Sequence, residues 1–109
     1  MFRIFKPATF DKDFNKLDNS EQKRVDKILN QLLERGGEVG KPLSGLSFFK
    51  EKKFDGKRLY FLVYENLQAI LVLAVNDKKA QQTTINLILR DFAQYQQYVL
   101  DELKKKGAT

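Results

Sequence analysis

Two stretches in the first third of the chain repeat their apolar residues with the 3.6-residue period of an amphipathic helix. In residues 10–17 the apolar positions are spaced i, i+4 and i+7, and Thr9 can cap a short helix there. Residues 19–35 begin with Asn19 and Gln22 at the spacing of a capping box and are followed by two glycines. The two stretches predict a helical hairpin, and the buried stripe of its longer helix would be Val25, Ile28, Leu29 and Leu32.

Strand patterns precede and follow this hairpin. Residues 2–5 predict a short N-terminal strand, and three further strands are predicted at residues 47–54, 58–64 and 68–75. Short turns separate the last three strands, and the first turn contains the strong turn dipeptide Asp55-Gly56. Because strands joined by such short turns pair with their neighbours in opposite directions, these residues predict a three-stranded antiparallel meander.

The last third of the chain completes the expected fold. The apolar run at residues 70–75 does not alternate with polar residues, which predicts a central strand covered on both faces. One long helix is predicted from Thr83 or Thr84 to about Lys105, because its apolar positions form a continuous helical stripe. We therefore expect an α+β fold with a short N-terminal strand, a helical hairpin, a three-stranded antiparallel meander and a C-terminal helix. Its length fits a single domain over residues 1–109.

Composition limits the chemistry that this chain can perform. Its 20 basic and 14 acidic residues give a formal net charge of +6, which favours a polyanionic partner. The chain has no Cys and no His, so it lacks disulfides, the usual zinc ligands and every Ser-His or Cys-His nucleophile pair. Any catalysis must use Lys, Arg, Tyr, Asp or Glu, and we expect no metal and no cofactor.

The apolar segments are short. The longest run, residues 69–75, is about a third of a membrane-spanning helix, and charged residues interrupt the N-terminal stretch too early for a signal peptide. These features predict a cytoplasmic protein that does not contact a membrane.

Basic residues gather at the turns and strand ends of the predicted sheet. A sheet with such a rim predicts a surface that binds phosphate groups. The same charges can also serve only to keep a hairpin soluble and its edge unpaired. The residues concerned are Lys52, Lys53, Lys57, Arg58, Lys78 and Lys79.

Four segments resemble, in this order, the RelE/ParE/HigB-like toxins of type II toxin–antitoxin systems: GKPLSGL, EKKF, GKRLYFLVY and ILVLAVNDKKAQQ. The preceding helical hairpin and the following helix also match the layout of that family. The resemblance implies the RelE-like toxin fold and a cognate antitoxin that is acidic and binds DNA. In catalytic members it also implies cleavage of mRNA on the ribosome, by attack of a ribose 2′-hydroxyl on the adjacent phosphate.

The resemblance assigns roles to individual residues. It implies that Lys53, Arg58 and Lys79 are catalytic and converge near one end of the sheet. Three positions depart from the family: Glu51 lies where RelE-type enzymes often carry a cation, Lys53 replaces the Arg more usual in HigB-like members, and Ile85 lies near the position where some carry a Tyr. Glu51 can pair with Lys53 or with Arg58. Further contacts to nucleic acid would come from Lys52, Lys57, Lys78 and Tyr98.

Three functions are compatible with these residues. A ribosome-dependent mRNA endonuclease is favoured by Arg58 and by the Lys78-Lys79 pair. The missing Tyr favours the two alternatives, which are a ParE-like toxin that inhibits DNA gyrase and a non-catalytic member of the same fold that binds nucleic acid or protein.

Overall fold

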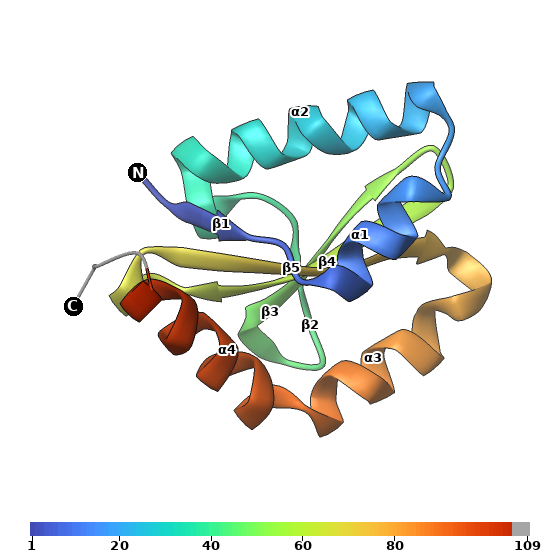
Figure 1. Cartoon of the computed structure of the whole chain (residues 1–109). Coiled ribbons are helices and arrows are strands. Elements are labelled where there is room, and N and C mark those ends of the chain that lie inside the picture. The colour runs from blue at the N-terminus through green and yellow to red at the C-terminus, as the bar shows by residue number, and fades with distance from the viewer. Residues whose placement is uncertain (106–109) are drawn as a thin grey trace.

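The computed structural model describes residues 1–105 and shows a twisted sheet between two layers of helices (Figure 1). Helices α1 and α2 pack on one face of the sheet, and α3 and α4 pack on the other. The helices and strands are β1 (Arg3–Phe5), α1 (Ala8–Asn15), α2 (Asn19–Arg35), β2 (Lys41–Leu43), β3 (Leu46–Phe54), β4 (Lys57–Tyr64), β5 (Ala69–Asp77), α3 (Gln81–Arg90) and α4 (Phe92–Lys105). Three 3₁₀ turns, η1 (Gly36–Glu38), η2 (Glu65–Leu67) and η3 (Lys78–Ala80), connect them.

The predicted antiparallel meander is present as β3, β4 and β5, but the sheet is larger than the prediction. It has five strands in the order β1-β5-β4-β3-β2. Strand β1 lies parallel to β5, and β2 pairs with β3 in the antiparallel direction. The expectation of a three-stranded sheet is therefore corrected to a five-stranded mixed sheet.

Strand β2 was missed because it is only three residues long. It is joined to β3 by Ser44 and Gly45, whose φ angles are 52° and 69°. Two successive residues with positive φ make the tight hairpin turn that matches the twist of antiparallel strands, and Asp55-Gly56 does the same between β3 and β4. The Ser-Gly dipeptide was therefore the local sign of this additional hairpin.

The strands β4 and β5 divide the interior into two cores. Along β4, Leu59, Phe61 and Val63 face the helix α2, whereas Tyr60 and Leu62 face α3 and α4. The prediction that the third strand of the meander is covered on both faces is confirmed, since β5 contributes to both cores. The middle strand of the five is nevertheless β4.

Both predicted N-terminal caps were wrong. Helix α1 begins at Ala8 after Pro7, whose fixed φ directs the chain into the helix, and no side chain caps it. Helix α2 has a capping box made by Asp18 and Glu21, one residue before the predicted pair. The spacing of a capping box was correct, but the pair that forms it lies one position earlier, because α2 already begins at Asn19.

The single long C-terminal helix was also wrong, because Asp91 separates α3 from α4. Arg90 donates two hydrogen bonds to the carboxylate of Asp91, from Nε at 3.0 Å and from Nη2 at 3.1 Å. The break changes the direction of the chain, so that α3 and α4 meet at an angle on the same side of the sheet (Figure 1). A continuous apolar stripe persists through such a bend, which is why periodicity alone did not reveal it. Among residues 1–105 no helix combines the length and the apolar character needed to cross a membrane.

The free edge of β5 beyond β1 is covered by α1. Strand β1 pairs with β5 only as far as Leu71, and farther along the edge the carboxylate of Asp13 accepts a hydrogen bond from the Val75 N–H at 3.1 Å. A side chain thus satisfies a backbone donor that has no strand partner on that side.

Replacing Asp13 with Ala is expected to lower the free energy of unfolding by about 1–3 kcal/mol, because the Val75 N–H then loses its acceptor in a partly buried position. Urea unfolding monitored by circular dichroism measures the change. Asp11→Ala is the matched control, since Asp11 is an exposed carboxylate on the same helix. Equal losses in the two variants would contradict the assigned role of Asp13.

Candidate nucleic-acid interface

The candidate interface lies where the β3–β4 hairpin meets the start of α3. Lys53 on β3 is directly opposite Arg58 on β4, and Glu51 is opposite Tyr60 in the same register. Because alternate residues of a strand share a face, these four side chains lie on the face that α3 covers. The predicted convergence of Lys53 with Arg58 therefore follows from the register that the Asp55-Gly56 turn imposes.

A buried ion pair forms the centre of this cluster. Arg58 Nη1 donates to Glu51 Oε1 at 3.3 Å, and the two side chains are only 10% and 5% exposed. The other oxygen of the Glu51 carboxylate, Oε2, accepts a hydrogen bond at 3.1 Å from Gln81 in the first turn of α3. Of the two partners considered for Glu51, Arg58 is the one that it contacts. A carboxylate thus connects the sheet arginine to the helix.

Polar atoms without partners surround the pair. Arg58 Nε, the Tyr60 hydroxyl and Asn76 Oδ1 are buried and have no hydrogen-bond partner among residues 1–105. Asn76 lies opposite Arg58 on β5, and its Nδ2 donates to the Thr84 hydroxyl of α3 at 2.7 Å. Between the sheet and the start of α3, polar atoms without hydrogen-bond partners therefore lie beside the buried Glu51–Arg58 ion pair.

The Tyr60 hydroxyl remains protonated near neutral pH. Burial first, and the nearby Glu51 carboxylate second, raise the pKa of Tyr60 to about 12, although the Arg58 guanidinium opposes the shift. The Tyr60 hydroxyl therefore keeps its proton and can donate it in a hydrogen bond, but it cannot act as a base.

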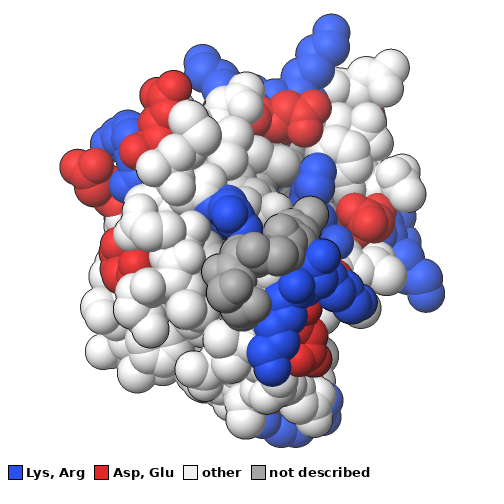
Figure 2. All heavy atoms as spheres, turned by 60° about the vertical axis from the view of Figure 1, so that its left-hand side comes forward, with Lys and Arg blue, Asp and Glu red and all other residues white. Residues whose placement is uncertain are grey.

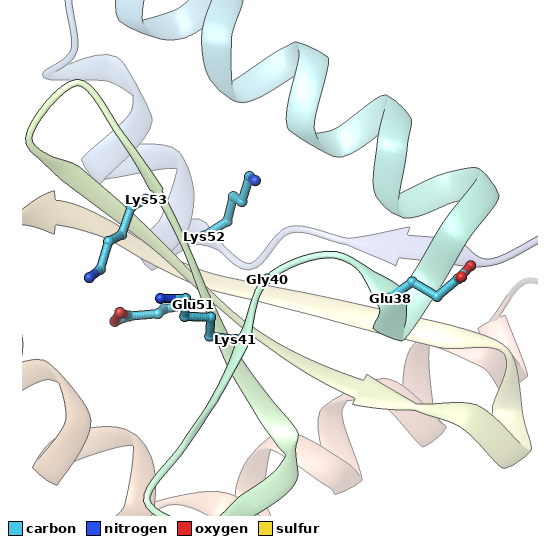
Figure 3. Close-up of a pocket in the computed structure, with 6 residues that line it drawn as sticks. All are labelled: Glu38, Gly40, Lys41, Glu51, Lys52 and Lys53. Carbon is cyan, nitrogen blue, oxygen red and sulfur yellow. The ribbon is translucent and has the colours of Figure 1, made fainter.

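Two shallow hollows open on the surface above this cluster, and Lys53 lines both. The first hollow, of about 320 Å³, is drawn in Figure 3 and is lined by Glu38, Gly40, Lys41, Glu51, Lys52 and Lys53. The second hollow, of about 340 Å³, is lined by Lys53, Phe54, Asp55, Gly56, Lys57, Arg58 and Lys78. Together they form a basic depression whose side chains can donate hydrogen bonds to phosphate oxygens.

The first hollow shows how alternation along β3 separates the lysines. In Figure 3 the side chains of Lys53, Glu51 and Lys41 extend to the α3 side of the strand, whereas Lys52 extends toward α2 and Glu38 points away from the other five. Lys41 lies beside Glu51 because β2 pairs with β3 at this position. Only a glycine allows the approach, since a Cβ atom at Gly40 would lie 2.6 Å from the Glu51 carbonyl oxygen.

The two other predicted cations of the β3–β4 hairpin belong to a different face. Lys52 is opposite Leu59, whose side chain packs in the core under α2. Lys57 Nζ lies 4.0 Å from a carboxylate oxygen of Glu21 at the start of α2. These two lysines border the hollows from the α2 side.

The two predicted lysines that follow β5 differ in their position relative to the hollows. Lys78 and Lys79 are both exposed on η3, and only Lys78 lines the second hollow. Asp77 holds this turn by accepting hydrogen bonds from the backbone N–H groups of Lys79 and Ala80. The catalytic role of Lys79 stays a prediction.

Tyr98 lies on α4, away from both hollows. It is half-buried against the core under α3 and α4, and its pKa is raised by burial and by the Glu102 carboxylate. Its contact with nucleic acid also stays a prediction.

Sequence reasoning missed three members of the cluster: Lys41, Asn76 and Gln81. The Ser44-Gly45 turn was the signal that could have placed Lys41 beside β3, by predicting the additional hairpin. No local signal identifies Asn76 or Gln81, because their roles depend on how α3 docks on the sheet.

On the face seen in Figure 2, Lys and Arg side chains are interspersed with Asp and Glu. Among residues 1–105 no group of three or more acidic, His or Cys side chains is arranged to hold a metal ion.

The fold is similar to that of several solved toxin structures. The free Escherichia coli toxin RelE, as a double arginine-to-alanine mutant, superposes with a TM-score of 0.67 and 19% identity, over 82% of this chain and 96% of RelE. The toxin in the intact E. coli RelBE toxin–antitoxin complex gives a TM-score of 0.62 and 22% identity, over 71% and 96% of the two chains. The corresponding values for the RelBE2 toxin–antitoxin complex of Mycobacterium tuberculosis are 0.61 and 19%, over 71% and 98%.

The comparisons that match this chain are those of three-dimensional structure. No protein-family model matches the sequence, and no curated protein matches it. At 17–22% identity the shared feature is the arrangement of strands and helices. The chain has the RelE-like toxin fold.

Proposed function

We propose that this protein is the toxin of a type II toxin–antitoxin system and cleaves mRNA on the ribosome. The observation that carries the proposal is the opposition of Lys53 and Arg58 on a RelE-like fold, at the edge of a depression that Lys78 also lines. A basic depression beside a buried arginine can hold the phosphate of a single RNA strand and stabilise additional charge on it.

The proposed reaction is attack of a ribose 2′-hydroxyl oxygen on the adjacent phosphorus. A bond forms between that oxygen and phosphorus, the bond from phosphorus to the 5′-oxygen breaks, and the products are a 2′,3′-cyclic phosphate and a 5′-hydroxyl. Arg58 stabilises the negative charge that develops on the phosphate oxygens. The exposed amines of Lys53 and Lys79 take part in the two proton transfers. This chemistry requires neither His nor a metal ion.

Controlled expression tests the proposal. We expect induction of the protein to stop growth and translation, and the mRNA to acquire new 5′-hydroxyl ends within coding regions. Sequencing of 5′-hydroxyl RNA ends after induction detects the cuts. Growth arrest with intact mRNA and new DNA breaks would instead identify a ParE-like inhibitor of gyrase.

We also propose that an acidic, DNA-binding antitoxin neutralises this protein in the cytoplasm by covering the basic depression. Structures with this fold have been solved in complex with antitoxins, which supports such a partner. The net charge of +6 favours an acidic one. Co-expression with the product of the adjacent reading frame is expected to restore growth, and the two proteins are expected to co-purify.

One observation favours a second candidate, a non-catalytic member of the fold that binds nucleic acid or protein. Arg58 is buried, and its guanidinium already contacts the Glu51 carboxylate. It is therefore less available to a substrate. Such a protein would bind RNA or ribosomes without producing new RNA ends, so the same sequencing experiment distinguishes the two candidates.

A further inference from the structure

Arg58 is in contact with an internal anion before any substrate arrives. Its Nη1 lies 3.3 Å from Glu51 Oε1, and Gln81 holds the other carboxylate oxygen in place. Arg58 also lines the second hollow beside Lys53 and Lys78. One side of Arg58 therefore faces a carboxylate, and another faces an open basic depression.

We propose that Glu51 is a positioning residue that competes with RNA phosphate for Arg58. This inference rests on the proposed function, because it names the regulation of the same site. A carboxylate and a phosphate present equivalent acceptors to a guanidinium, so one charge-assisted hydrogen bond can replace the other.

The competition lowers the affinity of the protein for RNA. When phosphate binds Arg58, the Glu51 carboxylate loses the guanidinium and keeps only its hydrogen bond from Gln81, in a position that is 5% exposed. Leaving a buried carboxylate unpaired is unfavourable, and this cost is subtracted from the binding free energy. Removing the negative charge of Glu51 removes the cost.

The test is binding of a short 2′-O-methyl oligoribonucleotide, which lacks the attacking hydroxyl and stays intact. Glu51→Gln keeps a carbonyl oxygen for Arg58 and removes the charge. We expect this variant to bind about tenfold more tightly, the size of one charge-assisted hydrogen bond. Because Arg58 contacts the phosphate in both proteins, the slope of log affinity against log salt should stay about the same. Fluorescence anisotropy at several salt concentrations measures both quantities.

Glu38→Gln is the matched control. Glu38 lines the same first hollow, but its side chain points away from Glu51 and Arg58, so it makes the same change in net charge without touching the pair (Figure 3). The gain in RNA affinity from Glu51→Gln should also vanish when Arg58 is replaced by Ala in the native protein and in the Glu51→Gln variant. Circular dichroism checks that each variant is folded. Glu51→Asp, which keeps the charge but has a shorter reach to Arg58, is the second variant and is expected to show a smaller gain.

Equal gains for Glu51→Gln and Glu38→Gln would overturn the inference, and so would a gain that persists without Arg58. The measurement does not depend on cleavage. If Glu51→Gln tightens binding through Arg58 while induction leaves mRNA intact, the proposed endonuclease activity fails and the competition stands. If mRNA is cleaved and Glu51→Gln leaves RNA affinity unchanged, the proposed competition is wrong and the proposed endonuclease activity stands.

Discussion

Arg58→Ala is expected to lower the free energy of unfolding by about 3–5 kcal/mol, because it leaves the Glu51 carboxylate buried without its ion-pair partner. The change also opens space next to Tyr60, which is fully buried on the same face of β4. A second substitution, Glu51→Gln, should restore part of the loss by removing the unpaired charge. Thermal and urea unfolding of the two variants measure the difference.

Lys53→Ala is the control for this prediction. Lys53 is the direct cross-strand neighbour of Arg58 and carries the same charge, but its side chain is exposed. Its replacement should change stability by less than about 1 kcal/mol, since exposed charges contribute little. A similar loss in Lys53→Ala and Arg58→Ala would mean that the buried pair does not dominate the stability of this hairpin.

The second large effect concerns activity. The double variant Arg58→Ala with Lys79→Ala is expected to lose at least about a thousandfold in cleavage rate, since it removes the charge stabilisation and one proton-transfer group together. Growth should then continue after induction, and new 5′-hydroxyl RNA ends should disappear. The assay is repeated with Glu51→Gln added to the double variant. Because Glu51→Gln is expected to restore part of the stability lost with Arg58, a loss of activity that persists there does not reflect loss of the fold.

Lys52→Ala with Lys57→Ala is the matched control for activity. It removes two positive charges from the same hairpin, on the side that faces α2. We expect its cleavage rate to fall far less than that of the Arg58 and Lys79 variant, because it removes phosphate contacts and leaves the proposed catalytic groups in place. If the control loses as much as the Arg58 and Lys79 variant, the loss reflects net charge and not a reaction centre. If both variants still arrest growth, the assigned catalytic residues are wrong.

The parts of the fold that could be predicted are those that neighbouring residues specify. The apolar stripe of α2 with its buried Val25 and Leu32, the Asp55-Gly56 turn and the antiparallel pairing around it all depend on contacts a few residues apart. The parts that were missed either have no local sequence pattern or form in spite of one. Strand β2 is too short to alternate, and the bend at Asp91 interrupts a helix whose apolar stripe continues.

The candidate site also contains contacts that neighbouring residues specify and contacts that they do not. Lys53 and Arg58 meet because a tight turn sets the register of two adjacent strands; the sequence predicted the turn, whereas the register comes from the structure. The Asn76 side chain reaches the same place only because the register of β5 shifts by one residue opposite Tyr60 and Phe61. A bulge of this kind turns every later side chain to the other face, and no residue pattern announced it.

By itself, the sequence determined the helical hairpin, the three strands of the meander with the tight turn between β3 and β4, and the exclusion of His and Cys chemistry. Only the tertiary structure decided that Glu51 would be buried against Arg58 and held by Gln81. The physical reason is distance along the chain. Gln81 lies 30 residues beyond Glu51, and the docking of α3 on the sheet, which brings them together, depends on packing of the whole core.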